Sequence, residues 1–201
     1  PNDNCCVNRD CPSPSTCDDG QCLITTGPPG CALGFCSVFV TSTVFDGGEI
    51  GGLTGADDKC QVAALGAGLS GRFKAWLSAG NQTPATRFAA GTGPWRLRPN
   101  DADGNDLPPV VATNLTDLVT CSGNCLQHAI DRTQTGEIVS GFNAVWTATF
   151  ADGTASSQTC AGWTSSTGGD FGFLGDASKA DAEWTNAARS FGCNIKSALY
   201  C

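Results

Sequence analysis

Residues 144–201, AVWTATFADGTASSQTCAGWTSSTGGDFGFLGDASKADAEWTNAARSFGCNIKSALYC, decide the fold of this 201-residue chain. The run VWTATF at 145–150 alternates with period two and is rich in β-branched and aromatic residues, a pattern typical of a β-strand. Asp152-Gly153 follows, and this dipeptide indicates a hairpin turn because glycine adopts the positive φ that the turn requires. We therefore expect a strand, a turn, a second strand, a long loop over residues 160–193, and a last strand that ends at Cys201.

The upstream half supplies a helix between two further strands. The alternating run FCSVFVTSTVF at 35–45 predicts the first strand. Thr54 has the side chain of a helix N-cap, and Asp57-Asp58 would lie in the first turn, where the helix dipole favours negative charge. Apolar residues then recur at helical spacing, which places Cys60 on the inner face of the helix. The run RFKAWL at 72–77 predicts the second strand.

The C-terminal segments VWTATFADGT, CAGWTSS, EWTNAARSFGC and ALYC resemble a C-type-lectin-like domain of the endostatin-like branch, which is found in secreted bacterial proteins. The upstream stretch FVTSTVFDGGEIGGLTGADDKCQVAALGAGLSGRFKAWLSAG matches the start of the same domain, so the resemblance covers residues 36–201. It implies an α+β, disulfide-stapled, C-type-lectin-like fold and does not fix a function. The sugar-binding tripeptides Glu-Pro-Asn, Gln-Pro-Asp and Trp-Asn-Asp are absent, and Glu183-Trp184-Thr185-Asn186 only echoes the last.

The resemblance also implies two nested disulfides, Cys60–Cys201 and Cys160–Cys193. In the chain-entropy model the longer loop contributes about 4–5 kcal/mol and the shorter one about 3 kcal/mol. The short spacing of Cys121 and Cys125 suggests a third, local bridge. Together these bridges would hold a loop-rich domain with little regular structure.

Composition favours an exported protein. Thirteen cysteines, a single histidine and no paired C-x-x-C spacing indicate disulfides rather than zinc sites. Disulfides persist in oxidising compartments, so we expect a secreted protein that is extracellular or at the cell surface. The opening PNDNCC predicts a mature chain from which an export signal has been removed.

The charge of the chain limits its partners. The formal net charge is −8, and no cluster of Lys and Arg is visible. Phosphate binding requires such clusters, which argues against nucleic acid and anionic membranes. No apolar run approaches the ~20 residues that span a bilayer, so we expect no membrane insertion.

The N-terminal region differs from the rest. The stretch CCVNRDCPSPSTCDDGQC holds five cysteines and little apolar material, so it must be stapled rather than packed around a core. It resembles the small Cys-rich knots that precede domains in large secreted bacterial proteins. We expect a disulfide knot and linker at residues 1–30 and the C-type-lectin-like domain at residues 31–201.

An odd number of cysteines remains after the three expected pairs: Cys5, Cys6, Cys11, Cys17, Cys22, Cys31 and Cys36. One of them must be unpaired, or bond to another chain, or bond to a segment outside this sequence. Cys5 or Cys6 is the expected odd residue, because adjacent cysteines rarely bond each other. An intermolecular bridge there would produce a homo-oligomer or polymer.

One loop offers ligands for calcium. Asp101, Asp103, Asn105 and Asp106 alternate within a few residues, and calcium prefers several carboxylate and amide oxygens at one point. The alternative is an ordinary Asp/Asn/Gly turn, whose side chains cap their own backbone. A second, weaker set consists of the three acidic residues Asp170, Asp176 and Asp181.

The tryptophans and phenylalanines divide into two groups. Trp76, Trp146 and Trp163 lie in strand-like or cysteine-flanked contexts, which predicts core packing. The others are candidate ligand-binding residues, because exposed aromatics in loops stack on sugars or contact protein partners: Trp95, Phe171, Phe173 and Trp184. The alternative is that these rings fill the underside of the fold.

The sequence favours binding over catalysis. His128 is the only histidine, and no Gly-x-Ser-x-Gly motif is present, so no catalytic set is recognised and we expect no enzyme. The leading hypothesis is an extracellular adhesion or binding module that recognises a glycan or protein ligand at the cell surface through residues 160–193. The first alternative is a structural subunit of a surface fibre or filament linked through the N-terminal segment. The second is a secreted hydrolase, since paired carboxylates are not excluded by sequence.

Overall fold

The structure, a computed structural model, describes residues 15–18, 21–24, 35–89, 92–98, 107–121, 125–141 and 143–201. In the N-terminal region, β1 (Ser15–Asp18) and β2 (Gln21–Ile24) pair antiparallel. The expected knot bridges and the residues Cys5 and Cys6 lie outside the described residues.

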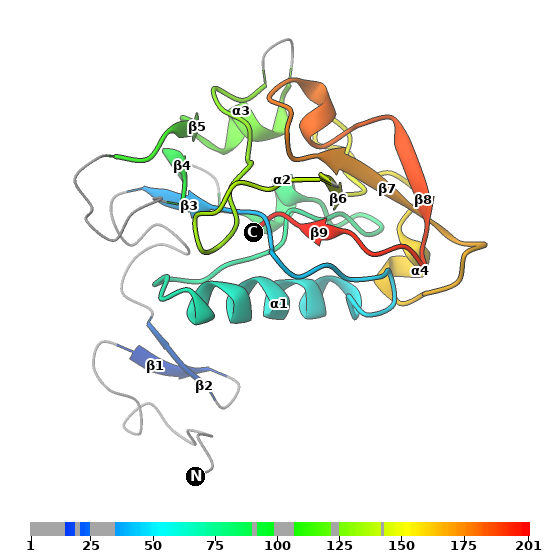
Figure 1. The fold of residues 1–201 in the computed structure, drawn as a ribbon, viewed down its shortest axis with the longest axis horizontal. Coiled ribbons are helices and arrows are strands. Elements are labelled where there is room, and N and C mark those ends of the chain that lie inside the picture. The colour runs from blue at the N-terminus through cyan, green and yellow to red at the C-terminus, as the bar shows by residue number, and fades with distance from the viewer. Residues whose placement is uncertain are drawn as a thin grey trace.

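The remaining described chain is a mixed α/β fold with two small sheets (Figure 1). The first sheet has the order β3-β4-β5, with β3 parallel to β4 and β5 antiparallel to it. The second has the order β8-β7-β6-β9, with the last strand β9 parallel to β6. Their bounds are β3 Cys36–Val38, β4 Trp95–Leu97, β5 Val110–Ala112, β6 Ala144–Trp146, β7 Phe171–Asp176, β8 Arg189–Gly192 and β9 Ala198–Leu199. The expected final strand before Cys201 is therefore confirmed.

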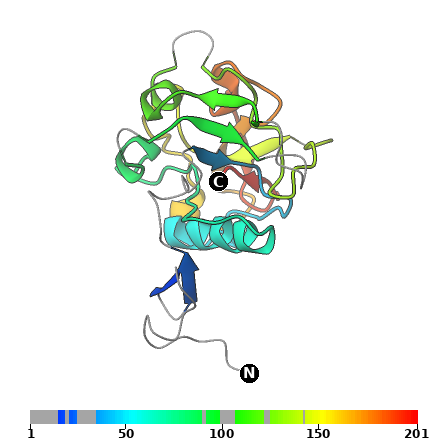
Figure 2. The ribbon, with the colours of Figure 1, turned by 90° about the vertical axis from the view of Figure 1, so that its left-hand side faces the viewer.

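The long helix α1 (Gly52–Gly66) lies along one side of the domain, and both sheets lie to the same side of it (Figures 1 and 2). Its buried residues are Ala56, Cys60 and Ala64, which confirms the predicted inner face. The predicted N-cap at Thr54 is wrong, and Asp57-Asp58 do not lie in the first turn. The helix starts earlier because Gly51 at the N-cap takes the left-handed conformation, with φ 76°, that glycine tolerates.

Two predicted strands are shorter than expected or missing. In the run 35–45, only β3 is a strand, followed by single bridges at Val40 and Phe45. The run 72–77 contains no strand, because some of its backbone N–H groups donate to side chains instead of to a neighbouring strand. Phe73 N–H donates to Gln61 Oε1 (2.9 Å), and Ala75 N–H donates to an Asp57 carboxylate oxygen (2.9 Å).

The C-terminal half is more regular than predicted. The hairpin turn after residue 150 is confirmed by the antiparallel bridge Thr149–Ala155 and by Gly153 at φ 79°, although its second strand is reduced to that bridge. The predicted long loop over residues 160–193 is wrong, because this segment contains β7 and β8. The central strand β7 is rich in glycine, which hid it from a sequence pattern that treats glycine as a strand breaker.

The remaining helices are short: α2 Pro84–Arg87, α3 Leu115–Val119, α4 Cys160–Trp163 and the 3₁₀ helix η2 Ala182–Trp184. The side chain of Asn114 accepts from Asp117 N–H at the start of α3, as its side-chain type predicts. Within the described ranges, no helix combines the length and the apolar character needed to cross a bilayer.

Two groups of buried residues form the core. The first, called here the aromatic cluster, includes Trp76, Trp95, Trp184 and Tyr200. The second, called the disulfide cluster, includes Cys60, Cys160, Cys193 and Cys201 with Trp146 and Trp163. The predictions that Trp76, Trp146 and Trp163 belong to the core are confirmed, since each is at most 5% exposed.

A chain of buried hydroxyl groups connects the two clusters. Trp163 Nε1–H, in the disulfide cluster, donates to the Ser78 carbonyl (2.8 Å), and Ser78 Oγ lies 2.8 Å from Thr149 Oγ1. Thr185 Oγ1 donates to the Thr149 carbonyl (3.1 Å) and accepts from Trp76 Nε1–H (2.9 Å), in the aromatic cluster. These polar groups therefore satisfy one another inside the protein.

Candidate functional site

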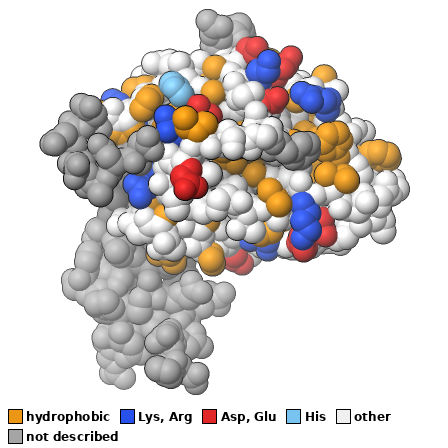
Figure 3. All heavy atoms as spheres, in the orientation of Figure 1, with side chains coloured by type: hydrophobic (Ala, Val, Ile, Leu, Met, Phe, Trp, Pro, Cys, Tyr) orange, Lys and Arg blue, Asp and Glu red, His pale blue; other side chains and the backbone are white. Residues whose placement is uncertain are grey.

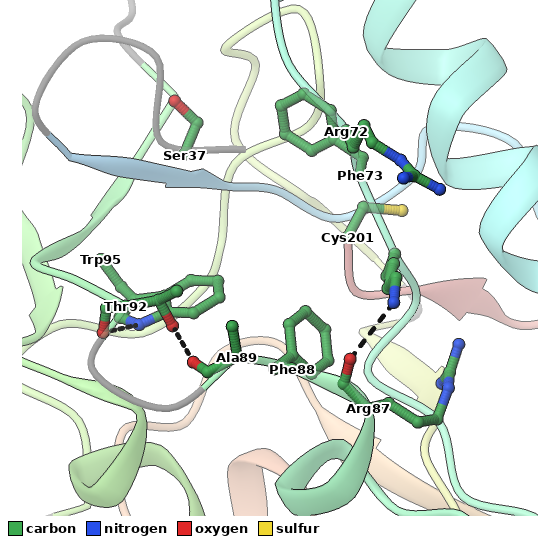
Figure 4. Close-up of a pocket in the computed structure, with 10 residues that line it drawn as sticks. Ser37, Arg72, Phe73, Arg87, Phe88, Ala89, Thr92, Trp95 and Cys201 are labelled. Atoms are coloured by element: carbon green, nitrogen blue, oxygen red, sulfur yellow. Dashed lines mark hydrogen bonds between the residues drawn. The ribbon is translucent and has the colours of Figure 1, made fainter. Parts of the chain in front are cut away.

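A pocket of about 110 Å³ opens beside the end of the chain (Figure 4). Its lining comes from β3, the extended segment 72–74, the end of α2, the start of β4 and the last residue: Ser37, Arg72, Phe73, Lys74, Arg87, Phe88, Ala89, Thr92, Trp95 and Cys201. We call this the aromatic pocket. The Cys60–Cys201 disulfide fixes one edge of it to α1.

Aromatic rings form the walls of the pocket. Phe88 lies between Trp95, with ring centroids 5.7 Å apart, and Trp76, with centroids 6.0 Å apart. The column continues inward through Trp184, 4.8 Å from Trp76, to Tyr200, 5.5 Å from Trp184. Such spacings are typical of favourable ring pairs, so the wall is part of the packed core rather than a set of loose side chains.

A smaller inner chamber of about 20 Å³ lies behind the pocket and shares Lys74, Phe88, Trp95 and Cys201 with it. Trp76, Trp184 and Tyr200 are among the residues that line this chamber. A cavity of this size holds about one water molecule.

Tyr200 is fixed and uncharged at the inner chamber. Its hydroxyl donates to the Trp184 carbonyl (2.9 Å). Burial raises the pKa of Tyr200 well above its ordinary value, and the negative charge of Asp176 adds to the effect. The phenol therefore remains a neutral donor across the physiological pH range.

Arg87 organises the floor of the pocket. Its guanidinium forms an ion pair with Asp57 of α1 and donates to the carbonyls of Ala75 and Leu77, each at 2.9 Å. The Arg87 side chain is only 7% exposed. The Arg87 guanidinium therefore bonds to groups inside the protein, and these bonds connect α2 to α1 and to the extended segment.

Lys74 and Arg72 supply the other positive charges. Lys74 is half-buried, and its Nζ donates to the Arg87 carbonyl at 3.2 Å. Arg72 is exposed, and its side chain points away from Phe88 and Trp95 (Figure 4). Among the described residues that line the pocket there is no Asp, Glu or His. The described lining therefore offers aromatic rings for packing and cations that donate hydrogen bonds.

Three of the four predicted ligand-binding aromatics are in the core. Trp95, Phe173 and Trp184 are 7%, 8% and 1% exposed, so the prediction of exposed stacking faces is wrong for them. Trp95 nevertheless lines the aromatic pocket, and both Trp95 and Trp184 line its inner chamber. Phe171 is 49% exposed, at the outer end of β7 and away from the pocket lining. The sequence could not distinguish the buried rings from the exposed one, because a glycine-rich stretch resembles a loop whether its aromatic ring is buried or exposed.

The candidate calcium ligands Asp101, Asp103, Asn105 and Asp106 lie outside the described residues. The second set does not converge: across the described ranges, no group of three metal-ligating side chains is present. Instead, Asp170 accepts from Ser165 and Thr167, and Asp176 accepts from Ser178. Asp181 accepts from Glu183 N–H at the start of η2. The carboxylates of this second set are therefore used in local turn and cap contacts.

The expected disulfide partners are brought together. Cys60 and Cys201 are bonded with Cα atoms 5.3 Å apart, and Cys160 and Cys193 with Cα atoms 5.6 Å apart. Cys121 and Cys125 form a local bridge. Cys36 is also disulfide-bonded.

Sequence reasoning missed the pocket residues Lys74, Arg87 and Phe88. The only signal in the sequence was the alternation of RFKAWL. In the structure Phe73 is buried in the core and the next residue, Lys74, is half-buried. Arg87 and Phe88 follow a Thr-Pro sequence that predicts a helix start, but no local pattern shows that this turn packs against α1.

Comparison with known proteins adds a family. The model of the family described as "Protein of unknown function (DUF1554)" matches residues 43–180. A search of curated proteins finds no match to the chain. Because the family match covers more than half of the 201 residues, the chain belongs to the DUF1554 family of proteins of unknown function.

Proposed function

We propose that the protein is an extracellular, non-catalytic binding or adhesion module that recognises a protein or glycan ligand through the aromatic pocket. The observation that carries the proposal is the pocket itself, in which Phe73, Phe88 and Trp95 surround an opening of about 110 Å³. An apolar cavity of about 150 Å³ is known to take one benzene ring, so this opening suits a single ring of a ligand.

The extracellular location of the protein is part of the same proposal. Three disulfides join described residues, and such bonds persist in oxidising compartments. The C-type-lectin-like fold is also part of the proposal, supported by the nested arrangement in which Cys60–Cys201 ties α1 to the last strand while Cys160–Cys193 lies inside that span.

The proposed binding surface differs from the one expected from sequence. Residues 160–193 contribute β7 and β8 to a sheet, so they form a scaffold more than a recognition loop. On the face shown in Figure 3, charged side chains of both signs are interspersed and form no single large patch. The aromatic pocket combines a cavity with three large rings, Phe73, Phe88 and Trp95, and this combination supports its choice as the binding surface.

Arrays of glycans and extracellular matrix proteins test the proposal. The variant Ala89→Trp is designed to fill the pocket from an exposed lining residue, and Phe171→Ala is the control at an exposed aromatic elsewhere. We expect array binding that Ala89→Trp abolishes and Phe171→Ala preserves. No binding above background on either array would contradict the function, and binding that survives Ala89→Trp would place it on another surface.

A further inference from the structure

We propose that the aromatic pocket binds an aromatic ring that carries a nearby carboxylate, as a protein ligand presents at a C-terminal aromatic residue. The inference rests on the proposed function and adds the chemical class of the ligand. It follows from two features of the pocket: the sign of its charges and the mainly apolar surface of its walls.

The charge of the lining is opposite to that of the chain. The chain has 19 acidic and 11 basic residues, yet three basic residues and no acidic residue are found among the described residues that line the pocket. Asp57 balances Arg87, whereas Lys74 has three N–H donors and gives one to the Arg87 carbonyl. A ligand anion next to Lys74 would therefore meet an ammonium group that still has donors to give.

Lys74 offers donors and a positive charge, so the complementary group is an anionic acceptor. A carboxylate offers two oxygens and a negative charge, and charge-assisted bonds of this kind are about twice as strong as neutral ones. Lys74 lines both the pocket and the inner chamber.

The walls favour an aromatic ring over a sugar ring. Phe73, Phe88 and Trp95 are the large wall residues, and Thr92 Oγ1 already donates to the Ala89 carbonyl. A sugar would bury several hydroxyl groups, and each one left without a partner would weaken binding. An aromatic ring carries no such groups and gains contact with the faces of Phe88 and Trp95.

Calorimetric titration of the full chain with N-acetylphenylalanine and N-acetylphenylalaninamide tests the inference. The two probes share the ring and differ in the charge of the terminal group. We expect the acid to bind about tenfold more tightly than the amide at low salt, with the preference falling as salt is added. Sodium glucuronate is the third probe and represents an acidic sugar.

Two variants assign the preference to named groups. Lys74→Met keeps most of the side-chain volume and removes the ammonium, so the acid should lose its advantage while the amide binds as before. Lys196→Met removes an exposed cation that pairs with Glu49 and is the matched control, with no expected change. Thermal unfolding checks that both variants fold.

Each outcome decides between the proposals. Equal affinity for acid and amide, or a preference that survives Lys74→Met, overturns the carboxylate inference and leaves the pocket as a ring-binding site. Tighter binding of glucuronate than of N-acetylphenylalanine overturns the aromatic class. Binding of no probe overturns the inference as a whole, whereas the proposed function is judged separately by the arrays and Ala89→Trp.

Discussion

The disulfide cluster and the aromatic cluster differ in the reach of the disulfides that join their described residues. In the first, covalent bridges join residues 141 and 33 positions apart in sequence, next to the helix α1. In the second, the bridge between described residues is the local Cys121–Cys125, and large rings provide the packing around the inner chamber. Cys201 belongs to the disulfide cluster and also lines the pocket. The comparison teaches that a region fixed by long-range bridges supports an adjacent region that is packed by rings and keeps a cavity.

Removing the Cys60–Cys201 disulfide should have the largest effect on stability and tests this comparison most directly. The double variant Cys60→Ala/Cys201→Ala should lower the free energy of unfolding by about 5 kcal/mol, because it releases a loop of 141 residues in the unfolded chain. Cys160→Ala/Cys193→Ala releases a loop of 33 residues and should lower the free energy of unfolding by about 3–4 kcal/mol. Urea unfolding followed by tryptophan fluorescence measures both. Equal or reversed losses would show that loop length does not govern the disulfide cluster.

The Arg87–Asp57 ion pair beneath the pocket provides a second test, at the boundary between the two clusters. Asp57→Ala should lower the free energy of unfolding by about 3 kcal/mol, because it leaves the Arg87 charge, only 7% exposed, without its partner. The neighbouring variant Asp58→Ala is the matched control, and its exposed carboxylate should change stability by less than about 0.5 kcal/mol. If both variants behave alike in thermal unfolding, Arg87 does not join α2 to α1 as described.

Tyr200 gives the smallest expected effect and a dependence on pH. Its pKa is raised by folding, so its contribution to stability is present below its ordinary pKa of 10.0 and is lost as the pH rises above that value. Tyr200→Phe should remove this alkaline loss and cost about 1–2 kcal/mol at neutral pH, because the Trp184 carbonyl loses its donor. Tyr200 is the only tyrosine, so phenolate absorbance follows it directly. Ionisation at an ordinary pKa in the folded protein would contradict its burial in the aromatic cluster.

Much of the disulfide cluster could be predicted from sequence, because its signals are local or carried by resemblance. Helical spacing placed Cys60 on the inner face of α1, and the Asp-Gly turn at residues 152–153 located the hairpin. The start of α1 was missed because two consecutive glycines, Gly51 and Gly52, both at φ 76°, allow a helix start without a side-chain cap.

The strand β7 was missed because its glycines have a packing role that a single sequence does not reveal. A Cβ on Gly172 would lie 2.5 Å from the Trp146 ring, and one on Gly175 would lie 2.0 Å from the Trp184 carbonyl oxygen. Both glycines are therefore required by close approach in a central strand rather than by a turn.

The aromatic pocket was beyond prediction because its residues meet only in three dimensions. Lys74, Phe88 and Trp95 come from three separate segments, and none of them carries a motif. The segment at 72–77 has the alternation of a strand, yet some of its hydrogen bonds go to side chains of α1. These hydrogen bonds replace those that a neighbouring strand would make, and no local sequence pattern predicts them because their acceptors lie in another segment.

The hydroxyl chain that links the clusters has a consequence for dissecting the molecule. Its members come from residues 78, 149 and 185, so the interior is complete only when the final segment is present. The family match ends at residue 180, before Thr185, Cys193 and Cys201. A fragment trimmed to that boundary would therefore lack Thr185 of the hydroxyl chain and one cysteine of each of the two long-range disulfides.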